Sequence, residues 1–292
     1  MSNKIFILII AISFAMSAHG QTEVVDTSQF VAVYEYECRT QTYDGKDIAD
    51  RMQVVVQVGR LSTKSMPFSS YVQNGESLES RVAKAYQEAY MHIPTVWTGL
   101  PTGHTTMREF IFPHEYDSTE ETPEIEWTLI GDTMTVSGYL CHQARATFRG
   151  VEWQVCYTEE IPSSAGPWRL NGLPGLIVRA ESVAHTFCLS ELRQEATPIT
   201  APDNNPDVQR TSYDKLMKFR NEILGNNQYA KNPLYYIAEM SGSASKGYTI
   251  SLGDNINHMD VINFEGKQYI LANGRPFLTR AHVFQPLEIN LK

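Results

Sequence analysis

The stretch FVAVYEYECR, residues Phe30 to Arg39, decides the fold class of this chain. Its aromatic, small and thiol side chains occupy the even positions, and the charged residues Glu35 and Glu37 occupy odd ones. Alternation with a period of two is typical of a strand that buries one face. Residues Asp50 to Val58 repeat the pattern, with apolar side chains at positions 52, 54, 56 and 58. We expect these two stretches to pair as neighbouring strands.

Further strands follow this pair, separated by turn signals such as Gly131-Asp132 and Arg149-Gly150. Glycine and proline supply the φ angles that tight reversals need. The expected strands lie around Met107 to Phe112, Glu126 to Ile130, Thr133 to Phe148, Val151 to Glu159, Leu176 to Ala180 and His185 to Leu192. The acidic tract Asp117 to Glu126 is expected to be a solvated loop. Residues Ala196 to Arg210 are expected to be a loop-like bridge, at which a domain boundary is possible but not required. The strands together indicate an antiparallel sheet.

The apolar period changes to three and four residues in two places, which indicates helices. One is expected behind Ser77 and ends before Pro94, and the other runs from Tyr213 to Leu224, with Ser212 as N-cap and Gly225 at C′. The sequence therefore predicts a mainly β (α+β) fold, a curved antiparallel sheet or half-open barrel packed on one or two helices. By analogy, this order of elements resembles the periplasmic lipoprotein-carrier fold.

The first twenty residues, MSNKIFILIIAISFAMSAHG, have the layout of a signal peptide. Lys4 precedes an apolar run from Ile5 to Met16, which is shorter than the roughly 20 residues of a membrane-spanning helix. We expect cleavage after Gly20 and export to the periplasm or the extracellular space. The alternative is a buried N-terminal core helix. Residues 21–292 are then expected to form a single β-rich domain without a transmembrane segment.

The charge balance opposes a nucleic-acid partner, because the formal net charge is −9 and a basic patch is the usual footprint of phosphate binding.

Four cysteines, in an exported protein, are disulfide candidates: Cys38, Cys141, Cys156 and Cys188. If Gly150-Val151 is the loop of a hairpin, Arg145 faces Cys156. Cys141 is then four residues away, or roughly 13 Å along the strand, which exceeds the ~7 Å Cα limit of a disulfide. We therefore expect Cys141 to bond Cys188 or Cys38, and Cys156 to take the remaining one. The sequence contains no C-x-x-C pair, so a zinc or redox site is not indicated.

The hexapeptide GLPGLI at Gly172 to Ile177 lies in a longer run that starts at Cys141 and includes Gly166-Pro167-Trp168. With the C-terminal Pro286-Leu287-Glu288, this run resembles the GLPGLI family of exported bacterial proteins. Cys156 and Val151 depart from the family pattern, which usually has an aromatic and a basic residue at these positions. The resemblance implies location and shape, and no activity, catalytic residue or cofactor is carried over from it.

Two interpretations of the hexapeptide stay open. Pro174-Gly175 suits the centre of a type II turn, with Gly175 at positive φ, so the motif could be a rigid turn that locks two strands. Alternatively, Trp168, Leu173 and Leu176 form a docking surface, because aromatic and aliphatic side chains on a stiff loop are good anchors. The candidate binding residues are Trp168, Leu173, Pro174, Gly175 and Leu176.

Catalytic motifs are missing from the sequence, which has no phosphate loop, H-E-x-x-H, EF-hand or G-x-S-x-G pattern. The S-x-x-K matches at Ser212 and Ser243 lack their companion signatures. Met91-His92 and His258-Met259 would suit copper only if the fold brought them together. We expect neither metal nor cofactor.

The leading hypothesis is a non-enzymatic envelope protein that binds a hydrophobic ligand or a partner protein. The alternatives are a hydrolase with an unrecognised site and an accessory subunit of an outer-membrane complex.

Overall fold

The computed structural model describes residues 23–42, 44–71, 93–111, 114–206, 208–225, 259–264, 267–272, 275–277 and 283–289. The predicted signal peptide, the helix expected behind Ser77 and both predicted copper-ligand pairs lie wholly or partly outside these residues. Among the residues described, no helix has the length and hydrophobicity that a membrane span requires.

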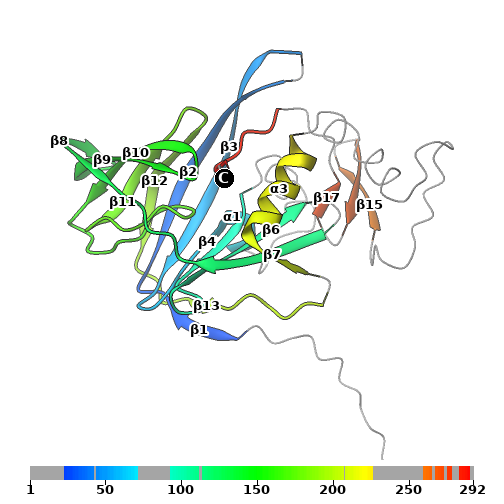
Figure 1. Ribbon diagram of the computed structural model, residues 1–292, viewed down its shortest axis with the longest axis horizontal. Helices are drawn as coiled ribbons and strands as arrows, with labels where there is room; N and C mark the ends of the chain where they lie inside the picture. The colour runs from blue at the N-terminus through cyan, green and yellow to red at the C-terminus, as the bar shows by residue number, and fades with distance from the viewer. Residues whose placement is uncertain are drawn as a thin grey trace, which may run out of the picture.

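A twelve-stranded sheet dominates the structure, in the order β14-β7-β6-β5-β4-β3-β2-β12-β11-β10-β9-β8 (Figure 1). Only β14 pairs in parallel with its neighbour, and the sheet is open, with β14 and β8 at its edges. The mainly β, antiparallel prediction is therefore confirmed. The strands are β2 (Phe30–Gln41), β3 (Asp47–Val58), β4 (Thr63–Pro67), β5 (Thr95–Thr98), β6 (His104–Ile111), β7 (His114–Glu121), β8 (Thr128–Val136), β9 (Tyr139–Phe148), β10 (Val151–Thr158), β11 (Leu176–Glu181), β12 (His185–Arg193) and β14 (Gln209–Thr211).

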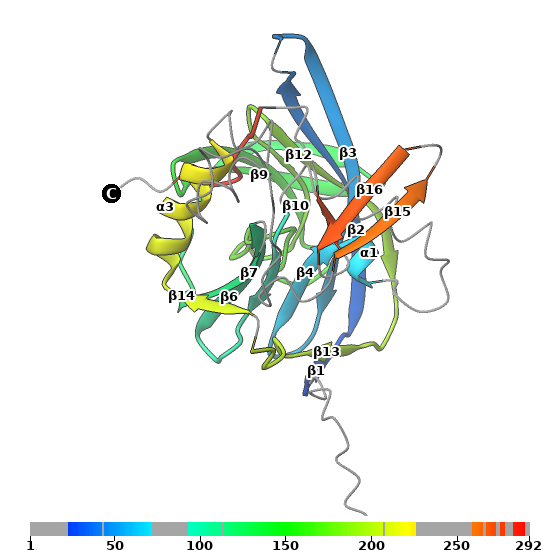
Figure 2. The same ribbon diagram turned by 90° about the vertical axis from the view of Figure 1, so that its right-hand side faces the viewer.

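Smaller elements surround this sheet. β1 (Val24–Thr27) pairs with β13 (Pro198–Thr200), and β15 (Met259–Phe264), β16 (Lys267–Ala272) and β17 (Arg275–Phe277) form a separate antiparallel sheet. The short α1 (Phe68–Tyr71) follows β4. The helix α3 (Tyr213–Leu224) has the predicted bounds and lies beside β7 (Figure 2).

The alternation in β2 and β3 creates the main core on the concave face of the sheet. The even-numbered side chains from Phe30 to Cys38 are buried there, opposite those of Met52 to Val58. The odd-numbered Val31, Val33 and Val55 are buried on the other face, which we call the outer face, under Phe68 and Tyr71 of α1. The long central strands therefore have apolar residues on both faces near α1 and charged residues on the outer face farther along.

Two predictions of local structure are wrong. The stretch Thr133 to Phe148 is two strands, β8 and β9, because Ser137 and Gly138 take φ angles of 51° and 86° and reverse the chain. The first half of the acidic tract, Asp117 to Glu121, belongs to strand β7 and not to a solvated loop, whereas Glu124 and Glu126 are exposed outside any strand. Asp117 is buried in β7 because Arg108 of β6 donates to both carboxylate oxygens, at 2.7 and 2.8 Å.

The predicted register of the β9–β10 hairpin is also wrong. The two loop residues are Arg149 and Gly150, at φ 51° and 79°, and Val151 faces Phe148. A tight hairpin turn with positive φ at both central residues favours glycine at the second, which places the loop one residue earlier than expected. Cys156 consequently faces Gln143.

Candidate functional site

The segment between β10 and β11 (residues 159–175), here called the motif loop, crosses the concave face of the sheet. The Trp168 backbone N–H donates to Ser65 Oγ of β4 at 3.0 Å. Its indole packs against Phe148 of β9 and Trp153 of β10, with ring centroids 5.8 and 5.9 Å apart. The loop therefore links strands from both halves of the sheet.

The predicted binding residues are mostly inside this core. Trp168 and Leu173 are each 3% exposed and Leu176 is 0% exposed, whereas Pro174 is exposed. Gly175 is buried as well. The three proposed anchors thus have almost no surface to offer a partner in this conformation.

The glycines of the hexapeptide have different roles from those expected. Positive φ occurs at Gly172 (94°) and not at Gly175, so the predicted type II turn centred on Pro174-Gly175 is wrong. Gly175 is required by space instead, because a Cβ there would overlap the carbonyl oxygen of Thr158. The close approach of the loop to β10 demands a residue without a side chain.

A buried charge cluster extends from the motif loop. Arg169 donates to Glu288 Oε2 at 2.8 Å and also pairs with Glu120 of β7. Burial alone would lower the pKa of Arg169, but Glu288 and Glu120 outweigh it and hold the pKa above its usual range. Arg149 of the β9–β10 turn contacts the other oxygen of Glu120 at 2.6 Å. These two arginines and two glutamates thus join four separate segments of the chain.

Helix α3 completes this charge cluster. Arg220 donates to the Glu288 carbonyl at 2.7 Å, and the Tyr213 hydroxyl donates to Glu288 Oε2 at 2.8 Å. Burial, together with the charge of Glu288, raises the pKa of Tyr213. The cluster is defined by Arg149, Arg169, Arg220, Glu120, Glu288 and Tyr213.

The C-terminal segment (residues 283–289) delivers Glu288 by crossing the concave face. Val283 N donates to the Gln41 carbonyl at 2.8 Å, and Ile289 N donates to the Arg149 carbonyl at 2.7 Å. Between these ends, Pro286 accepts a hydrogen bond from His185 Nε2 at 3.0 Å. The segments that carry the GLPGLI resemblance therefore meet in space, although more than 100 residues separate Arg169 from Glu288.

His185, the first residue of β12, also lies on this face, where it faces Cys38 of β2. Because a carbonyl can only accept, Nε2 carries the proton, and Nδ1 accepts from the Tyr36 hydroxyl at 2.8 Å. The ring also stacks on Trp153. Burial lowers the pKa of His185 to about 4, so the imidazole is neutral near pH 7. The contact of Tyr36 with His185 resembles an acid–base pair, but both residues are 1% exposed.

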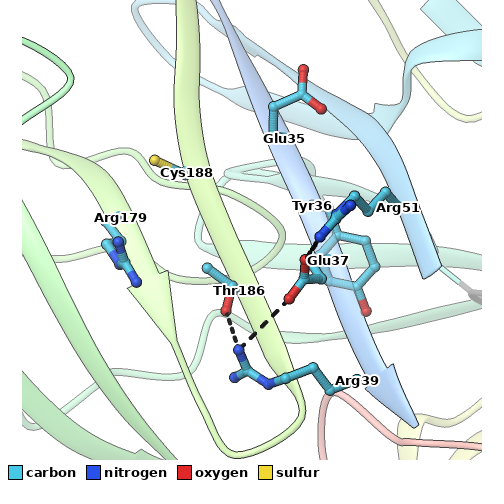
Figure 3. Close-up of a pocket in the computed structure, with 8 residues that line it drawn as sticks. All are labelled: Glu35, Tyr36, Glu37, Arg39, Arg51, Arg179, Thr186 and Cys188. Atoms are coloured by element: carbon cyan, nitrogen blue, oxygen red, sulfur yellow. Dashed lines mark hydrogen bonds and ion pairs between the residues drawn. The ribbon is translucent and has the colours of Figure 1, made fainter. Parts of the chain in front are cut away.

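The outer face carries an open hollow of roughly 230 Å³ over β2, β3, β11 and β12 (Figure 3). We call it the outer hollow, and its lining is Glu35, Tyr36, Glu37, Arg39, Arg51, Arg179, Thr186 and Cys188. The charged residues come from the odd-numbered positions of β2, from Arg51 on β3 and from Arg179 on β11. The alternation that builds the core therefore also builds this charged surface.

Arg39 is held firmly at one end of the outer hollow. Its guanidinium donates to the carbonyls of Ser182 and Val183 at 2.8 and 3.2 Å and to Thr186 Oγ1 at 3.3 Å. Arg51 pairs with Glu37 at 2.7 Å while 73% of its side chain stays exposed. Two guanidinium groups, on side chains that are 40% and 73% exposed, thus border one open surface.

The four cysteines are thiols, and the predicted disulfides are not confirmed. By strand register, Cys38 lies on the concave face with Tyr36, whereas Cys141, Cys156 and Cys188 share the outer face. Cys156 and Cys188 both face Arg179, so two strand spacings, about 10 Å, separate them. Within the part of the chain that is described, no group of three or more His, Cys, Asp and Glu residues is arranged to hold a metal.

Sequence reasoning missed the buried charge cluster, His185 and the outer hollow as sites. A signal existed for two of them. Glu288 belongs to the C-terminal tripeptide that carries the resemblance, and Glu35, Glu37 and Arg39 mark the solvent side of an alternating strand.

Comparison with known proteins assigns no family. No family model and no curated protein sequence matches the chain. Two solved structures, "Structure of PNGF-II in P21 space group" and "Structure of PNGF-II in C2 space group", give TM-scores of 0.44 and 0.42, each at 11% identity. Each match covers 66% of this chain but only 33% and 32% of those chains. The chain thus spans about a third of the length of the proteins it matches, and so weak a likeness assigns no function.

Proposed function

We propose that this chain is an exported, non-enzymatic cell-envelope protein of the GLPGLI type, and that it binds a partner protein on the outer face of the large sheet. The observation that carries the proposal is the position of the outer hollow. A carrier of the kind expected would hold its ligand on the concave face, where Trp168, Leu173 and the buried charge cluster already pack. The outer hollow is open and lies on the opposite face.

The chemistry of the outer hollow favours a protein partner that presents carboxylate side chains. Arginine is enriched in protein interfaces and forms bidentate pairs with carboxylates. Arg39 is braced by backbone carbonyls, which reduces the entropy lost on binding. Val183, which is 95% exposed, borders the same arginine and offers an apolar contact. A charged hollow with an exposed aliphatic rim fits a folded protein surface better than a lipid chain.

Affinity capture with matched variants tests this proposal. The protein is used as bait in envelope extracts, and partners are identified by mass spectrometry. Arg51→Ala and Arg179→Ala should each reduce recovery of a partner by tenfold or more. Arg210→Ala alters an exposed arginine on β14, far from the outer hollow in strand order, and should leave recovery unchanged. Equal recovery with all three variants would contradict the proposal.

A hydrophobic-ligand carrier and a hydrolase are the alternatives. A lipid-extraction mass spectrum of gently purified protein tests the first, because a stoichiometric lipid would favour it. The hydrolase reading needs an accessible nucleophile beside a base. A serine- or cysteine-directed probe that labels the protein in a fold-dependent manner would favour that reading over partner binding.

A further inference from the structure

Three cysteines and a methionine gather on the outer face beside the outer hollow. Met134 of β8 faces Cys141 of β9, and Cys156 of β10 faces Gln143, two residues along from Cys141. Facing residues and residues two apart share one side of a sheet, so all three sulfur side chains point the same way. Cys156 Sγ lies 3.6 Å from Met134 Sδ.

The sulfur group has a graded exposure. Met134 is 41% exposed, whereas Cys156 is 5% and Cys141 is 0% exposed. The thioether of Met134 is thus accessible to solvent, and the thiols of Cys141 and Cys156 are buried. Cys188 borders the group from β12, with Ser137 Oγ of the β8–β9 turn 3.8 Å from its sulfur. A ligand arriving from solvent would meet the thioether first.

We propose that Met134, Cys141 and Cys156 form a site for a soft monovalent metal ion, Cu(I). Thiolate and thioether sulfurs are the ligands that Cu(I) prefers, and three of them satisfy its low coordination number. The third ligand of this site is the thioether of Met134. The site therefore differs from metal sites whose ligands are only His, Cys, Asp and Glu.

Binding requires each thiol to release its proton to solvent as its sulfur bonds the metal. Two thiolates and one Cu(I) ion carry a net charge of −1, and the thioether adds none. Arg179 of β11 lies beside this charge, because it faces Cys156 of β10. The positive charge of its guanidinium favours the anionic, metal-bound sulfur of Cys156. Metal binding supplies the remaining driving force for deprotonation.

Titration of the full-length, reduced protein against a chromogenic Cu(I) chelator under anaerobic conditions tests the site. The wild-type protein should withdraw one equivalent of Cu(I) from the chelator, and X-ray absorption should show only sulfur ligands. Cys156→Ala should abolish the withdrawal. Met134→Leu alters a half-exposed side chain of similar volume, so the protein should fold normally and its Cu(I) affinity should fall at least tenfold.

Cys38→Ala is the matched control, because Cys38 is a buried cysteine on the opposite face of the sheet. It should bind Cu(I) as the wild type does. The proposal is overturned if the wild-type protein leaves Cu(I) on the chelator, if the folded Met134→Leu and Cys156→Ala variants both keep wild-type affinity, or if Cys38→Ala abolishes binding.

Discussion

Arg169 on the concave face and Arg51 on the outer face both pair with glutamates, yet 2% of the first side chain and 73% of the second is exposed. Arg169 meets Glu288 from the far end of the chain, whereas Arg51 meets Glu37 across one strand pair. A desolvated charge that loses its partner is costly, but an exposed pair is worth little. The two faces of one sheet thus hold their ion pairs differently, buried on the concave face and exposed on the outer face.

The motif loop and the C-terminal segment, which carry the resemblance, both lie on the concave face and contact each other there. Trp168 and Arg169 come from the motif loop, Arg149 from the β9–β10 turn and Glu288 from the C-terminal segment. Their contacts lock the ends of the sheet across its concavity. The hexapeptide and the C-terminal tripeptide are therefore parts of one structural unit, and the binding surface that we propose lies on the outer face.

The sharpest test of this division is Arg169→Met. Methionine keeps much of the side-chain volume but leaves Glu288 and Glu120 without their shared cation. We expect a loss of about 3–5 kcal/mol in the free energy of unfolding, measured by urea denaturation, because a buried carboxylate is left uncompensated. The double variant Arg169→Met/Glu288→Gln should lose less than the sum of the two single losses. A loss below about 1 kcal/mol for Arg169→Met would show that the cluster does not hold the fold.

The second test concerns pH, through His185. Burial depresses the folded-state pKa to about 4, whereas the unfolded value is about 6.5. The unfolded chain therefore binds more protons between these values, so stability is full above about pH 6.5 and falls as the pH drops toward 4. The loss amounts to about 3 kcal/mol over this range. Tyr36, the Pro286 carbonyl and the more distant charge of Arg39 provide no compensating anion.

His185→Gln isolates this contribution from that of the acidic residues. Glutamine does not titrate, so its free energy of unfolding should fall less steeply between pH 6.5 and 4 than that of the wild type. Parallel slopes for the two proteins in urea denaturation would rule out the buried neutral imidazole.

Local periodicity accounts for what could be predicted from the sequence. The alternation of β2 and β3 and the spacing of α3 are properties of short windows, and these elements have the expected faces. The register of β9 and β10 depends on which two residues form the hairpin loop. Placing that loop one residue too late gave every residue of β10 the wrong partner on β9. The prediction about Cys141 and Cys156 rested on that register.

The buried charges could not be predicted for a different reason. Asp117 and Glu120 lie in an acidic tract that is typical of a solvated loop, and their partners Arg108 and Arg169 lie elsewhere in the sequence. Burial of such a carboxylate is stable only because the fold places an arginine beside it. The composition of the segment therefore gives no sign that Asp117 is buried and Glu120 half-buried.

Packing of the motif loop gives a smaller expected effect. Gly175→Ala places a Cβ against the carbonyl oxygen of Thr158, so the loop must shift away from β10, which should cost about 1–3 kcal/mol. Gly131→Ala is the control, because nothing lies within 4 Å of a Cβ there and Gly131 does not take positive φ. Thermal denaturation should show a lower melting temperature for Gly175→Ala alone. Equal melting temperatures would mean that the loop adapts and that its close approach to β10 is not required.

The smallest expected effect on stability is that of Arg51→Ala on the outer face. The side chain is largely exposed and its pair with Glu37 is screened, so the free energy of unfolding should change by about 0 to 1 kcal/mol. Partner recovery should nevertheless fall, as proposed above for the outer hollow. Unchanged stability with lost binding in Arg51→Ala would be the counterpart of the stability loss expected for Arg169→Met. The two results together would separate the roles of the two faces. A loss of several kcal/mol would instead place Arg51 among the residues that hold the fold, and the division between the faces would fail.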